Sequence, residues 1–155
     1  MADERVFTTF NFLVEITVPN LPGVNGPVCN AAFAECDGLE ISIEPKSFHQ
    51  GGANTQQVHL AGVTSYAQLT LKRGMSHDLG LWRWFREVLQ TERRGLRGQA
   101  TVVMLGIDRT ELVTFKLTDC LPVKLRAPAL NGKEGMIAIE EMQLVYASLE
   151  LEFPS

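Results

Sequence analysis

The feature that most constrains this chain is the spacing of its apolar residues, which has a period of two along much of its 155 residues. Residues 10–18 form a run of aromatic and β-branched side chains that stops at Pro19, and Leu39, Ile41 and Ile43 alternate with polar residues. Such spacing is typical of β-strands, in which successive side chains point to opposite faces. The chain is therefore predicted to be mainly β.

Five further segments carry strand patterns, namely residues 32–36, 66–73, 100–107, 111–121 and 135–153. The last is too long for one ordinary strand, and its apolar phase slips at Glu140 and Glu141, which predicts a bulge or break there. Residues 19–27 are rich in Pro, Gly and Asn and are predicted to form a loop. Nothing marks a second domain, so residues 1–155 are expected to form a single one.

Residues 38–62 are predicted to form a long hairpin. Gly51 and Gly52 allow a sharp turn because glycine tolerates positive φ, and residues 58–60 return antiparallel to the first strand. Apolar side chains are sparse at the tip, which is typical of a segment that extends away from a core.

One helix is predicted, over residues 77–91, where the period changes. Ser76 or Asp78 is suited to cap it. Its apolar stripe consists of Leu81, Trp82, Phe85, Val88 and Leu89, and its polar side of Arg83, Arg86 and Glu87. Trp82 is expected to anchor the helix to the core, and Trp84 to lie half-exposed on the flank.

Composition and motifs argue against several functions. The net charge of −4 provides no positive field for a phosphate backbone, and no apolar run reaches the roughly 18–20 residues of a membrane span. No basic, apolar leader is visible at the N-terminus. The three cysteines have no CxxC spacing and are expected to be free thiols.

No catalytic or cofactor motif is visible, and no metal, cofactor or enzymatic activity is expected. His49 and His59 flank the hairpin tip, where a metal site would lack further ligands. Glu140 and Glu141 are adjacent strand residues that point to opposite faces, so a structural or interface role is favoured over an acid/base pair. Arg93, Arg94 and Arg97 are expected to form a solvated loop or to contact an acidic partner.

Several strands, notably residues 100–107 and 142–149, are apolar on both faces. A domain of this size cannot easily cover both faces of every strand, and open sheet edges are normally blunted, covered or paired. Burial against further copies of the chain would solve both problems, so the pattern favours oligomerisation.

Six collinear segments resemble the tail-tube family of contractile phages and contractile injection systems. They are FNFLVEI, FAECDGLEISIEPKSFHQGGANTQQVHLAG, LTLKRGMSHDLGLWRWFREV, TVVML, CLPVKLRAPALN and IAIEEMQLVYASLEL. The block containing K-R-G and the aromatic helix is the most specific. The resemblance spans nearly the whole chain, from Phe7 to Phe153.

The resemblance implies two packed antiparallel sheets, as a sandwich or barrel, with one outer helix. It also implies stacked hexameric rings around a hollow lumen for cargo or DNA, a surrounding sheath, and baseplate or tube-initiator partners. Assembly would occur in the bacterial cytoplasm, without membrane insertion or sequence-specific nucleic-acid binding. By this match the hairpin contacts other subunits through Leu39, Ile41, Ile43, Gly51, Gly52, Val58 and Leu60. Arg83, Arg86 and Glu87 would face the sheath, and the core would contain Leu69, Leu71, Trp82, Phe85, Phe115 and Leu117.

Three departures from the family pattern keep other roles open. The loop at residues 19–27 is long, Asp37 replaces a small or hydroxyl residue, and Cys120 and Leu121 stand where an aromatic residue before proline is commoner. They favour, as an alternative, a tube initiator or baseplate adaptor. A secreted ring protein of a type VI-like system and a β-sandwich enzyme or ligand-binding module are the remaining hypotheses.

Overall fold

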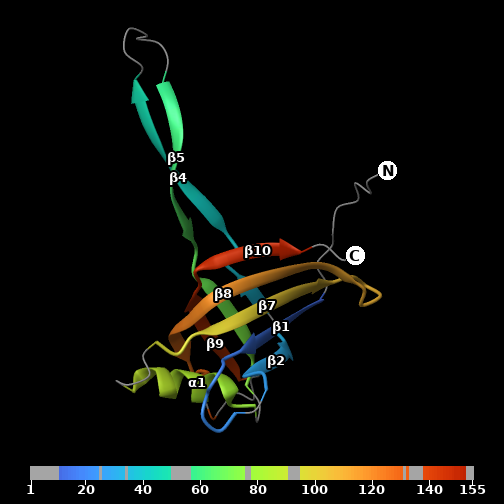
Figure 1. The fold of residues 1–155 in the computed structure, drawn as a ribbon. Coiled ribbons are helices and arrows are strands. Elements are labelled where there is room, and N and C mark those ends of the chain that lie inside the picture. Colours follow the sequence, from blue (N-terminus) through green and yellow to red (C-terminus); the bar gives the residue numbers. More distant parts are fainter. Residues whose placement is uncertain are drawn as a thin grey trace.

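The computed structural model describes residues 11–24, 26–33, 35–49, 57–75, 78–90, 95–130, 132 and 138–152. These residues form ten strands and one helix, and all pairs of strands are antiparallel (Figure 1). In chain order the elements are β1 Asn11–Thr17, β2 Cys29–Ala32, β3 Glu35–Asp37, β4 Ile41–His49, β5 Gln57–Tyr66, β6 Leu69–Gly74, α1 Gly80–Leu89, β7 Gly98–Leu105, β8 Glu111–Arg126, β9 Ile139–Val145 and β10 Ser148–Glu152. The prediction of a mainly β chain with one helix is confirmed.

The 16-residue strand β8 joins two sheets. Its first part pairs with β7 and β10, in a sheet that continues through β1 to β2. Its last part, from Leu121, pairs with β9, and that sheet continues through β6 to β3. Asp119, directly before the change of partners, has a positive φ of 51°, a conformation that aspartate tolerates better than most residues. The expected two antiparallel sheets are therefore present, linked by one long strand.

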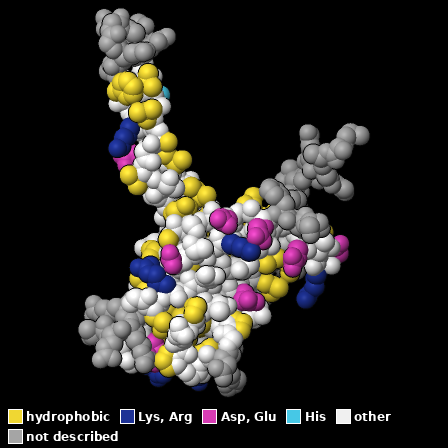
Figure 2. All heavy atoms as spheres, in the orientation of Figure 1, with side chains coloured by type: hydrophobic (Ala, Val, Ile, Leu, Met, Phe, Trp, Pro, Cys, Tyr) yellow, Lys and Arg dark blue, Asp and Glu magenta, His cyan; other side chains and the backbone are white. Residues whose placement is uncertain are grey.

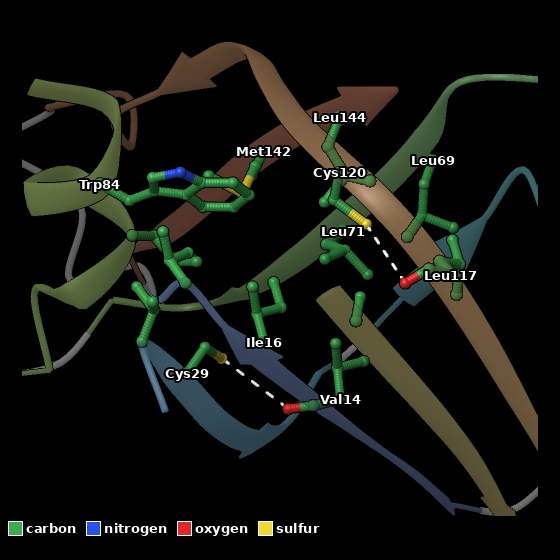
Figure 3. Close-up of a cluster of buried hydrophobic side chains, with 14 of the residues drawn as sticks. Val14, Ile16, Cys29, Leu69, Leu71, Trp84, Leu117, Cys120, Met142 and Leu144 are labelled. Atoms are coloured by element: carbon green, nitrogen blue, oxygen red, sulfur yellow. Dashed lines mark hydrogen bonds between the residues drawn. The ribbon is translucent and has the colours of Figure 1, made fainter. Parts of the chain in front are cut away.

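The core lies between the two sheets (Figure 3). Val14, Ile16 and Leu117 come from the first sheet and face Leu69 and Leu71 of the second, and all five are buried. Burying one such side chain stabilises a fold by roughly 1.5–3 kcal/mol. Period-two spacing placed Leu69, Leu71 and Leu117 on inward faces, and the partly buried Phe115 packs against the same cluster.

Two strand predictions are wrong in their boundaries. Residues 32–36 are not one strand, because β2 ends at Ala32 and pairs with β1 in the first sheet, whereas β3 begins at Glu35 and pairs with β6 in the second. The break in residues 135–153 lies at Tyr146 and Ala147 rather than at Glu140 and Glu141. Both β9 and β10 run antiparallel to β8, β9 beside residues 121–126 and β10 beside residues 114–118. The chain therefore needs a break only between these two stretches of β8.

The helix presents a different face to the core than its apolar stripe predicts. Trp84, expected on the flank, has 0% exposure and donates from Nε1 to the carbonyl oxygen of Leu96 at 3.0 Å. Trp82 and Phe85, expected in the core, are only partly buried, and Leu89 is exposed. Leu81, Trp84 and Val88 share one side of a helix at 3.6 residues per turn, and this side faces the sheets.

A buried ion pair within the second sheet provides the anchor for the helix. Arg73 Nε donates to Glu140 Oε1 at 2.6 Å, and both side chains are buried. Trp82 Nε1 donates to the other carboxylate oxygen of Glu140 at 2.8 Å, and the Arg73 guanidinium lies 5.4 Å from the Phe33 ring centroid. Glu140 thus has a structural role, while Glu141 lies on the opposite, more exposed face of β9.

The helix is too short to cross a membrane, and no described helix is both long and apolar enough to do so. Cys29, Cys36 and Cys120 are free thiols, as predicted. Burial raises the pKa of the Cys36 and Cys120 thiols to about 12, which keeps them protonated and unreactive near neutral pH.

Candidate assembly interface

The hairpin of β4 and β5 projects well beyond the two packed sheets (Figure 1). Its strands pair only with each other among the described strands, from Ile41 opposite Tyr66 to His49 opposite Gln57. The predicted hairpin is therefore present, but β5 continues past Gly62 to Tyr66, which the sequence placed in the next strand. Gly51 and Gly52 lie outside the described residues.

Large apolar side chains on this hairpin are exposed. The exposed fractions are 51% for Ile41, 53% for Ile43, 48% for Phe48 and 52% for Leu60. Figure 2 shows hydrophobic side chains along the projecting arm, away from the body of the molecule. The alternation of Ile41 and Ile43 had predicted a half-buried strand, and within one chain that prediction is wrong. Large apolar side chains left exposed in this way are typical of a surface that contacts another protein.

A β-bulge divides the hairpin into two parts. Ile43 pairs with Thr64 and Pro45 with Ala61, so two residues of β5, Gly62 and Val63, stand opposite a single residue of β4. A Cβ atom added at Gly62 would lie 2.2 Å from the carbonyl oxygen of Glu44, which explains why glycine occupies this position. The bulge shifts the alternation of β5 by one residue.

This shift creates two apolar patches on opposite faces of the ladder. The base patch consists of Ile41, Ile43 and Tyr66, near the body. The distal patch consists of Phe48, Val58 and Leu60, since Phe48 pairs with Val58 and Lys46 with Leu60. Along β4, the odd-numbered side chains of Ile41 and Ile43 point to one face of the ladder, and the even-numbered side chain of Phe48 points to the other. The two patches therefore lie on different faces.

The sides behind the patches are polar. Ser42 and Ser65, behind the base patch, share a hydrogen bond of 2.9 Å, and Ser47 pairs with His59 behind the distal patch. Polar side chains therefore lie behind both patches, while Val63, which is 68% exposed at the bulge, and the Pro45–Ala61 pair are apolar positions outside them.

Tyr146 fixes the root of the hairpin. Its hydroxyl donates to the carbonyl oxygen of Gly38 at 2.7 Å and accepts from the backbone N–H of Glu40 at 3.3 Å. Its ring lies 5.4 Å from that of Tyr66, centroid to centroid. Burial raises the pKa of the Tyr146 phenol. Sequence reasoning missed this residue, because nothing in the alternation distinguishes its hydroxyl from a surface one.

Gly38 and Leu39 complete the root. Gly38 has a φ of 111°, and an added Cβ would lie 2.0 Å from the carbonyl oxygen of Gln68. Leu39, which is expected to contact other subunits, is partly buried and packs against this chain's own core.

The first sheet has two open edges. Among the described strands, β2 pairs only with β1, and β10 pairs only with β8. Open edges carry unpaired backbone groups that can add a further strand. The β10 edge also carries acidic residues, one of which, Glu152, lies 2.8 Å from Lys116 Nζ.

The exposed side of the helix is cationic. Arg83 and Arg86 are exposed, but Glu87, expected beside them on the surface, has only 6% exposure. Glu87 lies on the inner side of the helix, with one carboxylate oxygen 3.9 Å from Arg86. Arg97 is exposed and donates to the carbonyl oxygen of Asp119 at 3.3 Å, while Arg93 and Arg94 lie outside the described residues.

The described residues contain no group of three or more His, Cys, Asp or Glu side chains suited to a metal ion. His59 pairs with Ser47 and His49 with Gln57, so the two histidines are not cross-strand partners. The features that stand out are instead an apolar arm, two open sheet edges and a cationic helix face.

These features define a β-sandwich of the tail-tube type, a fold that presents surface for other protein chains. The chain belongs to the family described as T4-like virus tail tube protein gp19, whose model matches residues 8–150. This confirms the family resemblance found in the sequence. No curated protein sequence matches the chain.

Solved structures share the fold. A chain from the six-fold symmetrised anti-feeding prophage baseplate superposes with a TM-score of 0.80 at 24% identity, covering 99% of this chain and 98% of that one. A chain from the PVC extracellular contractile injection system, in its extended sheath–tube complex, gives 0.77 at 18% identity over 97% and 94%. Hcp1 from Salmonella typhimurium gives 0.54 at 12% identity over 93% and 87%.

Proposed function

We propose that this chain is a non-enzymatic subunit of the inner tube of a contractile, phage-tail-like injection particle. Six copies form a ring, and rings stack into a hollow conduit inside a contractile sheath, with a baseplate at one end. Family membership supports the tube role. The likeness to chains from a six-fold symmetrised baseplate and a sheath–tube complex supports the hexameric, sheathed setting.

The observation that carries this proposal is the exposed apolar hairpin. Four large side chains are about half exposed on an arm whose two strands pair only with each other among the described strands, namely Ile41, Ile43, Phe48 and Leu60. Covering the exposed half of one such side chain stabilises an assembly by about 1 kcal/mol. Because every subunit repeats the contact, small contributions add up along a tube.

The two patches have different reach. About seven residues separate Ile41 from Phe48, which at roughly 3.3 Å per residue is about 23 Å. The base patch is accessible to a neighbour that contacts the body, and the distal patch to a subunit farther away. The two open edges, β2 and β10, complement this arrangement, since ring closure through paired edges leaves none exposed.

The test is deletion of residues 45–59, followed by negative-stain imaging and light scattering. The deletion spares the core between the two sheets, so we expect a cooperative thermal transition close to that of the full chain. Tubes and rings should be lost, leaving a folded, non-polymerising subunit. Long tubes formed by the deletion variant would refute the assignment of the hairpin.

A second candidate function is a tube initiator or baseplate adaptor. The likeness to the baseplate chain, at 24% identity, is higher than the 18% to the sheath–tube chain. An adaptor would form single rings that do not lengthen as protein concentration rises, whereas a bulk tube subunit would form tubes whose length increases. Particle-length distributions at several concentrations separate the two roles.

The outer face of the helix is proposed to contact the sheath. Arg83 and Arg86 present positive charge there, while Glu87 is buried and is withdrawn from this surface. An acidic strip on the sheath subunit is the complementary partner.

A further inference from the structure

The turn between β7 and β8 holds an isoleucine out into solvent. Ile107 is 78% exposed. The turn around it is well ordered: Gly106 N–H donates to the Thr110 carbonyl at 2.9 Å and Arg109 N–H to the Gly106 carbonyl at 3.0 Å. The Asp108 carboxylate accepts from Thr110 N–H at 3.1 Å. Because this turn is already fixed by its hydrogen bonds, it can insert an apolar side chain into a partner without losing further backbone conformational entropy.

A hollow of about 400 Å³ lies on the outer side of the helix. It is lined by Leu79, Trp82, Arg83 and Arg86, which follow one another at helical spacing along one side of the chain. Trp82 is fixed by its bond to Glu140, and Leu79 is 43% exposed. The hollow therefore has an apolar floor and a cationic rim.

The turn and the hollow lie at opposite ends of β7. The strand begins at Gly98, where an added Cβ would lie 3.4 Å from the Trp84 ring, and it ends at Leu105, next to the turn. Eight residues of strand span roughly 26 Å. A knob and a recess on opposite ends of one chain can make a heterologous contact, which repeats head to tail from one copy to the next.

We infer that Ile107 of one copy inserts into the hollow of the next copy along the tube axis. Asp108 accompanies it and pairs with Arg83 on the rim. The exposed Glu111 and Arg109 add one negative and one positive charge, so the turn has a net charge of −1 opposite the cationic rim. Arg86, whose side chain is 71% exposed one helical turn farther on, stays available to the sheath. This contact rests on the proposed tube function, and it is separate from the hairpin.

Disulfide cross-linking between copies tests the contact. The double variant I107C/L79C should give a ladder of covalent oligomers on non-reducing gels after mild oxidation. The matched control I107C/L130C places the second thiol on an almost fully exposed residue outside the hollow. We expect at least about tenfold more cross-linked oligomer from the first pair. Burial makes the native Cys36 and Cys120 thiols poor competitors.

Imaging the same samples separates this inference from the proposed function. Tubes with a ladder support both. Tubes without a ladder, or with equal ladders from the two pairs, overturn the contact and leave the tube function standing. If neither tubes nor a ladder form, both fail.

A pair of arginine variants supplies a second readout. Arg83→Ala should shorten tubes severalfold while rings persist, and Arg126→Ala, which removes an exposed arginine outside the hollow, should leave tube length nearly unchanged. Equal tube lengths in the two variants would contradict the pairing of Asp108 with Arg83.

Discussion

The packed sheets and the projecting hairpin are built from similar sequence patterns but have opposite solvent exposure. In β6, Leu69 and Leu71 alternate with Thr70 and Lys72, and both leucines are buried in this chain's own core. In β4, Ile41 and Ile43 alternate with polar residues in the same way but are about half exposed. The comparison teaches that alternation identifies a face to be covered without saying which chain covers it.

The two regions also differ in how their polar groups are satisfied. Every buried side-chain nitrogen or oxygen atom among the described residues has a hydrogen-bond partner. The Arg73–Glu140 pair follows that rule inside the body. The buried polar groups described in the body are thus satisfied within the chain, whereas four large apolar side chains of the hairpin are about half exposed.

The largest expected effect is on the stability of the body. Trp84→Ala removes the largest fully buried side chain and should lower the free energy of unfolding by about 3–5 kcal/mol. Leu89→Ala is the control, since this residue is exposed on the same helix, and it should change stability by no more than about 0.5 kcal/mol. Chemical denaturation of both variants measures the difference. Equal losses would mean that the helix packs by the stripe predicted from its sequence.

The helix shows why part of the core was not predictable. Tryptophan occupies both position 82 and position 84, and these lie about 200° apart around a helix. Either side offers a large apolar residue, so the pattern alone does not determine which one faces the sheets. The position of Glu87 follows from the same rotation, because it lies on the Trp84 side.

The strands were more predictable than their partners. Period-two spacing located the inward-facing Leu69, Leu71 and Leu117, but the change of partner within β8 depends on strands that are distant in sequence. The bulge opposite Glu44 likewise depends on pairing, and so does the division of the hairpin into two patches. The hairpin itself was recognised from its glycine pair and from the family resemblance.

An intermediate effect is expected at the junction of the two regions. Tyr146→Phe keeps the ring but removes the hydroxyl that bonds to Gly38 and Glu40, so the free energy of unfolding should fall by about 1 kcal/mol. Assembly should weaken further than this loss suggests, because the hairpin root would lose its fixed direction. On the same samples, light scattering measures assembly and chemical denaturation measures the free energy of unfolding. Full-length tubes at unchanged critical concentration would show that Tyr146 does not position the hairpin.

The smallest effect on stability is expected at the two patches, and it should accompany a large effect on assembly. Ile43→Ser in the base patch and Phe48→Ser in the distal patch should each change the free energy of unfolding by no more than about 0.5 kcal/mol, since neither side chain contributes to the core. Ser42→Ala and Ser47→Ala change the polar faces behind them and serve as matched controls. If the patches contact different neighbours, the serine variants should stop assembly at different sizes, which analytical ultracentrifugation resolves. Identical products from Ile43→Ser and Phe48→Ser would indicate that one neighbour covers both patches. Tubes like those of the wild type from both variants would show that the apolar side chains of the hairpin do not contact other copies.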